Sequence, residues 1–137
     1  MKSLKVYLCD LTHETVILVS DTIPVNIGYI ASYAKKIHGD SIDISLFKYP
    51  STAIEAIKKN PPDVLGLSNY SWNSLLSERI AQIAKQINPK TIVVQGGPNF
   101  PEHDPGQQLE FLTKRPNTNF HIMFEGEASF SNILDRV

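Results

Sequence analysis

Two short apolar runs constrain the fold of this chain more than any other feature of its sequence. Residues 63–68 (DVLGLS) and 91–95 (TIVVQ) are compact and do not alternate between apolar and polar residues. Strands that are covered on both faces have this pattern, whereas a strand with one face in solvent alternates. Segments of helical periodicity flank both runs. This alternation of strands with helices indicates a parallel sheet, because parallel neighbours need crossover connections.

The remaining segments complete a βαβαβαβαβα order. Further strands are predicted over 4–9, 41–47 and 120–124, and the second of them alternates as a half-exposed edge strand does. Helices are expected over 24–38, 51–59, 72–87 and 107–114, with a last helix after Glu127. We therefore predict a single domain over residues 1–137. It is an α/β/α, flavodoxin-like or Rossmann-like fold with a five-stranded parallel sheet in the order 2-1-3-4-5.

Composition excludes several classes of function. Thirteen Lys and Arg against 14 Asp and Glu give a net charge of −1, so no basic excess is available for nucleic-acid phosphates. The single cysteine, Cys9, excludes an internal disulfide framework and any cluster held by several thiolates. The N-terminus has no signal-peptide pattern, and no stretch approaches the ~20 apolar residues of a membrane span. The sequence predicts a cytoplasmic domain that binds neither nucleic acid nor membrane.

In a sheet of this kind, ligands bind outside the carboxyl ends of the strands. The Gly-x-Gly-x-x-Gly and phosphate-loop motifs are missing, and the loop after the first strand has no glycine to cradle a flavin phosphate. A phosphorelay receiver needs aspartate and lysine where Ser68 and Glu125 stand. Small residues remain at three strand ends: Ser68, then Gly96 and Gly97, then Gly126. They indicate a slot for a large flat ligand with an insertable tail, because glycine lets other groups approach the backbone closely.

Four motifs, in this order, resemble the cobalamin-binding domain that precedes the catalytic barrel of class B radical SAM enzymes. They are PVNIGYIASYA at 24–34, VLGLS at 64–68, IVVQGGP at 92–98 and FEGEASF at 124–130. The resemblance covers nearly the whole chain. It implies a bound cobalamin whose corrin lies across the strand ends and whose tail enters a slot beside Ser68, Gly96 and Gly97.

The same resemblance implies the other residues of the site. The corrin or its side chains would be bordered by Tyr70, Ser71, Pro98 and Asn99. Glu125, Gly126 and Glu127 are similar to the family's Gly-Glu-Gly-Glu stretch, with Glu125 in place of its first glycine. Asp10 and Pro24 complete the predicted set of cofactor-binding residues.

Cobalt ligation and catalysis are expected to lie elsewhere. Cobalamin-dependent methyltransferases and mutases carry Asp-x-His-x-x-Gly after the first strand, and the histidine of this motif ligates cobalt. Here His13 stands one place late after Asp10, and no glycine follows three residues beyond it, so we predict no protein ligand and keep His13 only as the alternative. A [4Fe-4S] cluster and S-adenosylmethionine would belong to a downstream radical SAM barrel of the same polypeptide. That barrel is the predicted partner, and this chain is not expected to catalyse the parent enzyme's methyl-transfer or cyclisation reaction alone.

Simpler interpretations of the same residues stay open. Gly96 and Gly97 can form a tight turn, in which case Gly97→Val should cost stability, whereas a channel residue predicts an unchanged melting temperature. Ser68 can be a helix N-cap, Trp72 a core residue and Cys9 a small buried apolar residue. Two alternative functions follow: a vestigial docking or dimerisation scaffold without cofactor, and a flavin-binding flavodoxin-like protein. The sequence does not specify the oligomeric state.

Overall fold

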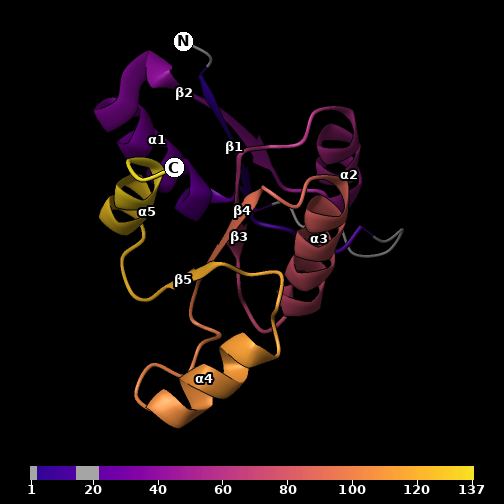
Figure 1. The fold of residues 1–137 in the computed structure, drawn as a ribbon, viewed down its shortest axis with the longest axis vertical. Helices are drawn as coiled ribbons and strands as arrows, with labels where there is room; N and C mark the ends of the chain where they lie inside the picture. The colour runs from indigo at the N-terminus through magenta and orange to yellow at the C-terminus, as the bar shows by residue number, and fades with distance from the viewer. Residues whose placement is uncertain (1–2, 15–21) are drawn as a thin grey trace.

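A five-stranded parallel sheet forms the centre of the molecule (Figure 1). The computed structural model describes residues 3–14 and 22–137. The strands lie in the order β2-β1-β3-β4-β5, which confirms the predicted fold class and topology. Their bounds are Leu4–Cys9 for β1, Ile42–Phe47 for β2, Val64–Ser68 for β3, Ile92–Gly96 for β4 and Phe120–Ile122 for β5. All five residues of β3 are buried, as its unbroken apolar run predicts.

Helices cover both faces of the sheet. On one face, α1 (Val25–His38) and α5 (Glu127–Leu134) pack over Val6, Leu8, Val64 and Val94. On the other face, α2 (Pro50–Lys59) and α3 (Ser74–Ile87) pack over a second apolar cluster that contains Cys9, Leu65, Leu67 and Val93. A short 3-10 helix at Gly39–Ser41 joins α1 to β2. Alternate residues of each strand therefore supply the two cores, and even-numbered residues of β3 face α1 and α5.

The last part of the chain departs most from the predicted elements. Helix α4 (Pro105–Thr113) stands away from the sheet at the bottom of Figure 1. It is attached through an aromatic cluster in which the His121 ring stacks on Phe100 at 4.1 Å and meets Phe111 edge to face. Strand β5 ends at Ile122, not at 124, because Phe124 takes a left-handed conformation with φ 62° that a strand cannot continue.

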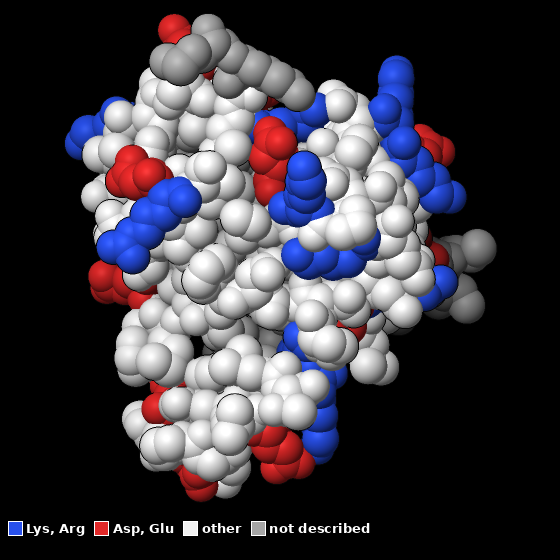
Figure 2. Space-filling view, viewed as in Figure 1, with Lys and Arg blue, Asp and Glu red and all other residues white. Residues whose placement is uncertain are grey.

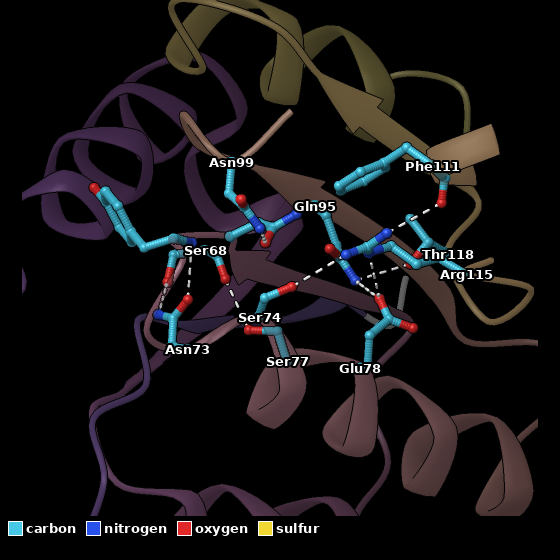
Figure 3. Close-up of polar contacts among 12 residues, drawn as sticks. Ser68, Asn73, Ser74, Ser77, Glu78, Gln95, Asn99, Phe111, Arg115 and Thr118 are labelled. Atoms are coloured by element: carbon cyan, nitrogen blue, oxygen red, sulfur yellow. Dashed lines mark hydrogen bonds and ion pairs between the residues drawn. The ribbon is translucent and has the colours of Figure 1, made fainter. Parts of the chain in front are cut away.

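Arg115 joins this outlying part to the rest of the domain (Figure 3). Its guanidinium lies over the Phe111 ring at 3.4 Å, donates to Ser74 Oγ at 3.2 Å and pairs with Glu78 at 3.4 Å. Gln95 in turn donates to Glu78 Oε1 at 2.6 Å and to Thr118 Oγ1. These contacts connect the region after β4 to α3.

The prediction that Trp72 belongs to the apolar core is wrong. Helix α3 begins at Ser74, so Trp72 lies in the preceding turn, where it is 63% exposed and its ring stacks on Tyr70. Leu75, one step further along the expected apolar stripe, is 87% exposed. The N-cap interpretation of Ser68 is also wrong, because Ser68 is the last residue of β3 and Asn73 occupies the N-cap position.

The face shown in Figure 2 carries charges of both signs, and both signs also occur on the outlying part at the bottom that contains α4. This agrees with the near-zero net charge of the chain. Among the described residues, no helix is long and apolar enough to cross a bilayer.

Candidate functional site

A cavity of about 480 Å³ opens at the carboxyl edge of the sheet, on the face covered by α1 and α5. Its volume lies within the range of roughly 300–1,000 Å³ that small-molecule sites occupy. Apolar side chains form most of its wall, from the two helices and from the strands: Leu8, Ile27, Ile30, Val94, Ile122 and Phe130. Ser68, Gly96, Gly97 and Pro98, all predicted from the sequence, line the same cavity.

Four glycines line this cavity, Gly66, Gly96, Gly97 and Gly126, and the first three differ in the room that each has for a side chain. A Cβ on Gly66 would lie 2.5 Å from Leu8 Cδ2, and one on Gly97 would lie 2.6 Å from the backbone oxygen of Asn69. Gly97 also has φ 132°, a conformation that other residues avoid. A Cβ on Gly96, by contrast, would make ordinary contacts with Ile122 at 3.6 and 3.8 Å. Gly66 and Gly97 are therefore needed by the fold, and Gly96 is the glycine that can be changed with least strain.

A hydrogen-bond network fixes the side chain of Ser68, and Figure 3 shows its contact with Asn73. Ser68 Oγ lies 2.6 Å from Asp10 Oδ1 and 3.0 Å from Asn73 Nδ2. Asn73 also donates to the backbone oxygen of Leu11 at 3.1 Å and accepts from the Tyr70 N–H at 2.8 Å. The predicted residues Asp10 and Ser68 are thus in direct contact although they are 58 positions apart in the sequence.

The charged side chains around the cavity are acidic. Glu102, Glu125 and Glu127 line it, and no lysine or arginine occurs among the described residues of its wall. Glu127 stands in the first turn of α5, where a carboxylate interacts favourably with the positive end of the helix dipole. The arrangement suits a ligand that presents hydrogen-bond donors or positive charge.

The segment that precedes α5 contains a strained residue. Phe124 lines the cavity with φ 62° and is 72% exposed, and it is the non-glycine residue with positive φ in the described part of the chain. In the family's Gly-Glu-Gly-Glu stretch, the sequence analysis placed Glu125 at the position of the first glycine. The conformation that favours glycine instead occurs one residue earlier, so Phe124 is the position that a glycine would suit.

A smaller hollow of about 210 Å³ lies beside the first, over the end of β1. Asp10 and Pro24, both predicted site residues, line this second hollow, and so does Trp72. Tyr70 lines both hollows, and its ring stacks on Trp72 at 4.5 Å with an angle of 8° between the planes. Tyr70 therefore joins the two hollows along the edge of the sheet.

Three other predicted residues lie outside both hollows. Asn99 faces a surface groove beside α4, and its amide donates to Asn69 Oδ1 at 3.2 Å. Ser71 is exposed, and it lines neither these two hollows nor the groove beside α4. His13 is exposed, with Nε2 2.9 Å from the Trp72 carbonyl oxygen, to which it donates.

Over residues 3–14 and 22–137, no group of three or more His, Cys, Asp or Glu side chains gathers in a way that could hold a metal ion. Cys9 is fully buried, and burial together with the neighbouring Asp10 raises the pKa of its thiol, which therefore stays protonated. The interpretation of Cys9 as a small buried apolar residue is confirmed.

Sequence reasoning missed four residues of this edge. Gly66 carried a signal, because a glycine inside a buried strand often marks close packing. Phe124 was quoted only as the start of a motif, and its backbone conformation has no sequence signature. Asn73 and Asn26 contact partners that are distant in the sequence, and the Asn26 amide donates to the Tyr70 hydroxyl at 3.1 Å.

Comparison with known proteins connects this geometry to a family. The sequence profile of the family described as "B12 binding domain" matches residues 16–134. The chain is 28% identical over 117 residues to 2-(S-pantetheinyl)-carbapenam-3-carboxylate methyltransferase of Streptantibioticus cattleyicolor, covering 82% of this chain and 16% of that protein. It is 38% identical over 73 residues to the cobalamin-dependent radical SAM methyltransferase TokK of Streptomyces tokunonensis, covering 53% of this chain and 10% of TokK.

Solved structures share the fold at low sequence identity. A cobalamin-binding protein from Desulfitobacterium hafniense superposes with a TM-score of 0.63 at 14% identity, covering 97% of this chain and 58% of that one. The signal receiver domain of the response regulator NarL from Mycobacterium tuberculosis has the same TM-score of 0.63 at 15% identity, covering 99% and 97%. These likenesses describe the fold alone, so the assignment to a family depends on the sequence match.

Proposed function

Because this chain belongs to the B12 binding domain family, we propose that the cavity of about 480 Å³ receives the tail of a cobalamin and that the corrin lies across the carboxyl edge of the sheet. In this arrangement, Ser68 and Gly96 border the tail, and Pro98, Glu125 and Gly126 lie around the mouth of the slot. Tyr70 and Trp72 form an aromatic border toward the hollow that contains Asp10.

The observation that carries this proposal is the combination of an apolar cavity with an acidic rim. Cobalamin has an amide-rich corrin periphery, whose N–H groups are donors for Glu102, Glu125 and Glu127. A flavin mononucleotide would instead bring a phosphate group, and phosphate sites need N–H donors or cations. The wall of the cavity, over the described residues, has no lysine or arginine for that purpose. The acidic rim therefore favours cobalamin over flavin.

The residues of this chain hold and orient the cofactor. When bound, cobalamin supplies a cobalt centre that carries one-carbon groups. The chain's contribution is a rigid slot, since Gly97 fixes the turn after β4 and Asn73 fixes the loop after β3. The His13 ring is held by the Trp72 carbonyl through Nε2, which agrees with a cobalt that receives no imidazole from the protein.

We extend the proposal to the parent protein. The chain spans 16% and 10% of the two methyltransferases that it matches, so their activity belongs to a larger molecule. We propose that the chain is the cobalamin module of a cytoplasmic radical SAM enzyme of the methyltransferase type. Its partner would be a downstream barrel that binds the [4Fe-4S] cluster and S-adenosylmethionine, and the module alone would not be catalytic.

Spectroscopic titration tests the proposal. Addition of hydroxocobalamin should shift the visible spectrum and saturate at one equivalent, whereas flavin mononucleotide should give no change. Gly96→Val, which adds a side chain beside the slot, should weaken retention at least tenfold. Gly28→Ala is the matched control, because a Cβ there meets nothing within 4 Å. Flavin binding without cobalamin binding would favour the flavodoxin-like alternative, and binding of neither ligand would favour the scaffold.

A further inference from the structure

A strained aromatic residue stands at the mouth of the cavity of about 480 Å³. Phe124 lines this cavity, has φ 62° and is 72% exposed. The left-handed conformation is costly for a residue with a bulky side chain, because its Cβ comes too close to the following carbonyl oxygen. An exposed aromatic ring also gains little from the hydrophobic effect. In the free domain, Phe124 is therefore unfavourable both in its backbone and in its side chain.

The surrounding structure holds this conformation in place. Before the strained residue, Ile122 pairs in register with Gly96 of β4. After it, Gly126 is the N-cap of α5, and a Cβ on Gly126 would lie 3.2 Å from Ile30 Cδ1, so the chain runs close against α1. The backbone has to turn between these two fixed points, and Phe124 is the residue that takes the left-handed conformation there.

The turn accounts for the backbone conformation but not for the aromatic ring. Glycine takes this conformation without strain, and asparagine tolerates it. Phe124 belongs to neither of the two apolar clusters found among the described residues, so packing in a core does not compensate for the strain. Strained residues of this kind are concentrated at ligand clamps and other functional sites. Since Phe124 lines the cavity, the compensating contact is one with the molecule that occupies it.

The position of Phe124 indicates which part of a cobalamin it meets. The corrin is proposed to lie across the edge of the sheet, and the base is at the far end of the tail, so the base lies deepest in the cavity. The ribose, which joins the base to the phosphate, then passes the mouth, where Phe124 is exposed. The C–H groups of a ribose are suitable partners for the face of an aromatic ring.

We infer that the Phe124 ring packs on the ribose of the cobalamin tail, and that this contact offsets the strain of the left-handed backbone. The inference rests on the proposed function, since it assumes that the tail enters this cavity. It has a specific consequence. Removal of the ring should weaken binding of the cofactor, while removal of the strain stabilises the free domain, so stability and affinity change in opposite directions in Phe124→Gly.

The test measures dissociation constants of two ligands by visible spectroscopy, hydroxocobalamin and cobinamide. Cobinamide has the same corrin but lacks the phosphate, the ribose and the base. Phe124→Ala removes the ring and keeps a Cβ in the left-handed position, whereas Phe124→Gly removes both. Met123→Ala is the matched control, because Met123 is the neighbouring apolar residue, is 41% exposed and is not among the residues that line the cavity.

Phe124→Ala and Phe124→Gly should both weaken hydroxocobalamin binding by roughly threefold to tenfold, which corresponds to about 25–55 Å² of apolar surface covered on the ring. Phe124→Tyr should stay within twofold of wild type, since it restores the ring, and so should Met123→Ala. Cobinamide should bind to all variants equally, because it has no ribose. Saturating hydroxocobalamin should raise the melting temperature of wild type more than that of Phe124→Gly.

Other outcomes contradict the inference separately from the proposed function. Hydroxocobalamin affinities within twofold of wild type in both Phe124→Ala and Phe124→Gly would overturn the contact and leave the cobalamin site intact. A loss in Phe124→Gly alone would also overturn it, because the backbone and not the ring would then matter. An equal loss for cobinamide would assign Phe124 to the corrin or to the fold. If wild type does not retain cobinamide, Phe124→Ala against Met123→Ala on hydroxocobalamin decides. Failure of wild type to bind hydroxocobalamin would refute the proposed function itself.

Discussion

Replacement of Gly97 by alanine should destabilise the domain, although the added group is a single methyl. The Cβ would lie 2.6 Å from the Asn69 backbone oxygen and 3.1 Å from the Asn69 backbone nitrogen and carbonyl carbon. These atoms belong to the backbone, and the Asn69 N–H is itself bonded to the Gly96 carbonyl at 2.7 Å, so neither side can move without breaking the turn. The φ of 132° adds strain of its own.

The size of the effect follows from these two contributions. A non-glycine residue in a glycine-only conformation costs about 1–3 kcal/mol, and an overpacked contact costs about 1–3 kcal/mol. Alanine recovers about 0.4–1 kcal/mol by restricting the unfolded chain. The net loss is roughly 1–6 kcal/mol. For 137 residues the unfolding entropy is about 0.3 kcal/mol per degree, so the melting temperature should fall by roughly 3–20 °C.

Thermal unfolding followed by circular dichroism measures this shift, with Gly96→Ala as the matched control. A Cβ on Gly96 makes only ordinary contacts with Ile122, so its melting temperature should stay within about 3 °C of wild type. A Gly97→Ala protein that melts within about 3 °C of wild type would refute the argument. The result also separates the two sequence-based expectations for Gly97, which are a tight turn and the wall of a channel. The geometry supports the tight turn, in which a substitution costs stability.

Three further changes test other parts of the structure. Burial and the nearby Arg115 lower the pKa of His121 to about 4, so the unfolded chain binds more protons than the folded chain between pH 6.5 and 4. The free energy of unfolding should therefore fall as the pH falls through that window. His121→Phe should remove this fall, which urea unfolding at pH 7 and pH 5 measures. Phe124→Gly should raise the free energy of unfolding by about 0.5–1 kcal/mol, because it relieves the strain of the left-handed backbone conformation. The same variant should bind hydroxocobalamin more weakly in a titration. A melting temperature below that of wild type would contradict the relief of strain. Asn73→Asp should be more destabilising than Asn73→Ala in urea unfolding at neutral pH, because the fully buried carboxylate would face Asp10 and the Leu11 carbonyl.

The fold could be predicted almost completely because its signals are local. The unbroken apolar runs at 63–68 and 91–95 identified the buried strands, and the alternating run at 41–47 identified an edge strand. Each pattern depends on residues within one element, where the period of the side chains is fixed by geometry. The start of α3 was misplaced because Trp72 and Leu75 continue the apolar period of the helix by sequence, although both are exposed in the structure.

The site could be predicted only where a backbone requirement selects the residue type. Gly97 belongs to this class, since its φ of 132° and the approach of Asn69 leave room for glycine alone. Phe124 is the informative exception. Its backbone takes a conformation that favours glycine, but the residue is aromatic, so the sequence conceals the strain and the assignment moved to the neighbouring Glu125.

The hydrogen bonding of Ser68 could not be predicted in this way, because the residue type alone does not say whether its hydroxyl donates or accepts. A serine hydroxyl can donate one hydrogen bond and accept two, and its protein partners decide how much of this capacity is already used. Here those partners are Asp10, 58 residues earlier, and Asn73, whose amide is oriented by the Tyr70 N–H. A motif that contains Ser68 specifies its place at the edge of the sheet. The hydrogen-bond partners of its hydroxyl are two residues outside that motif, Asp10 and Asn73, so the motif alone does not specify how this serine is held.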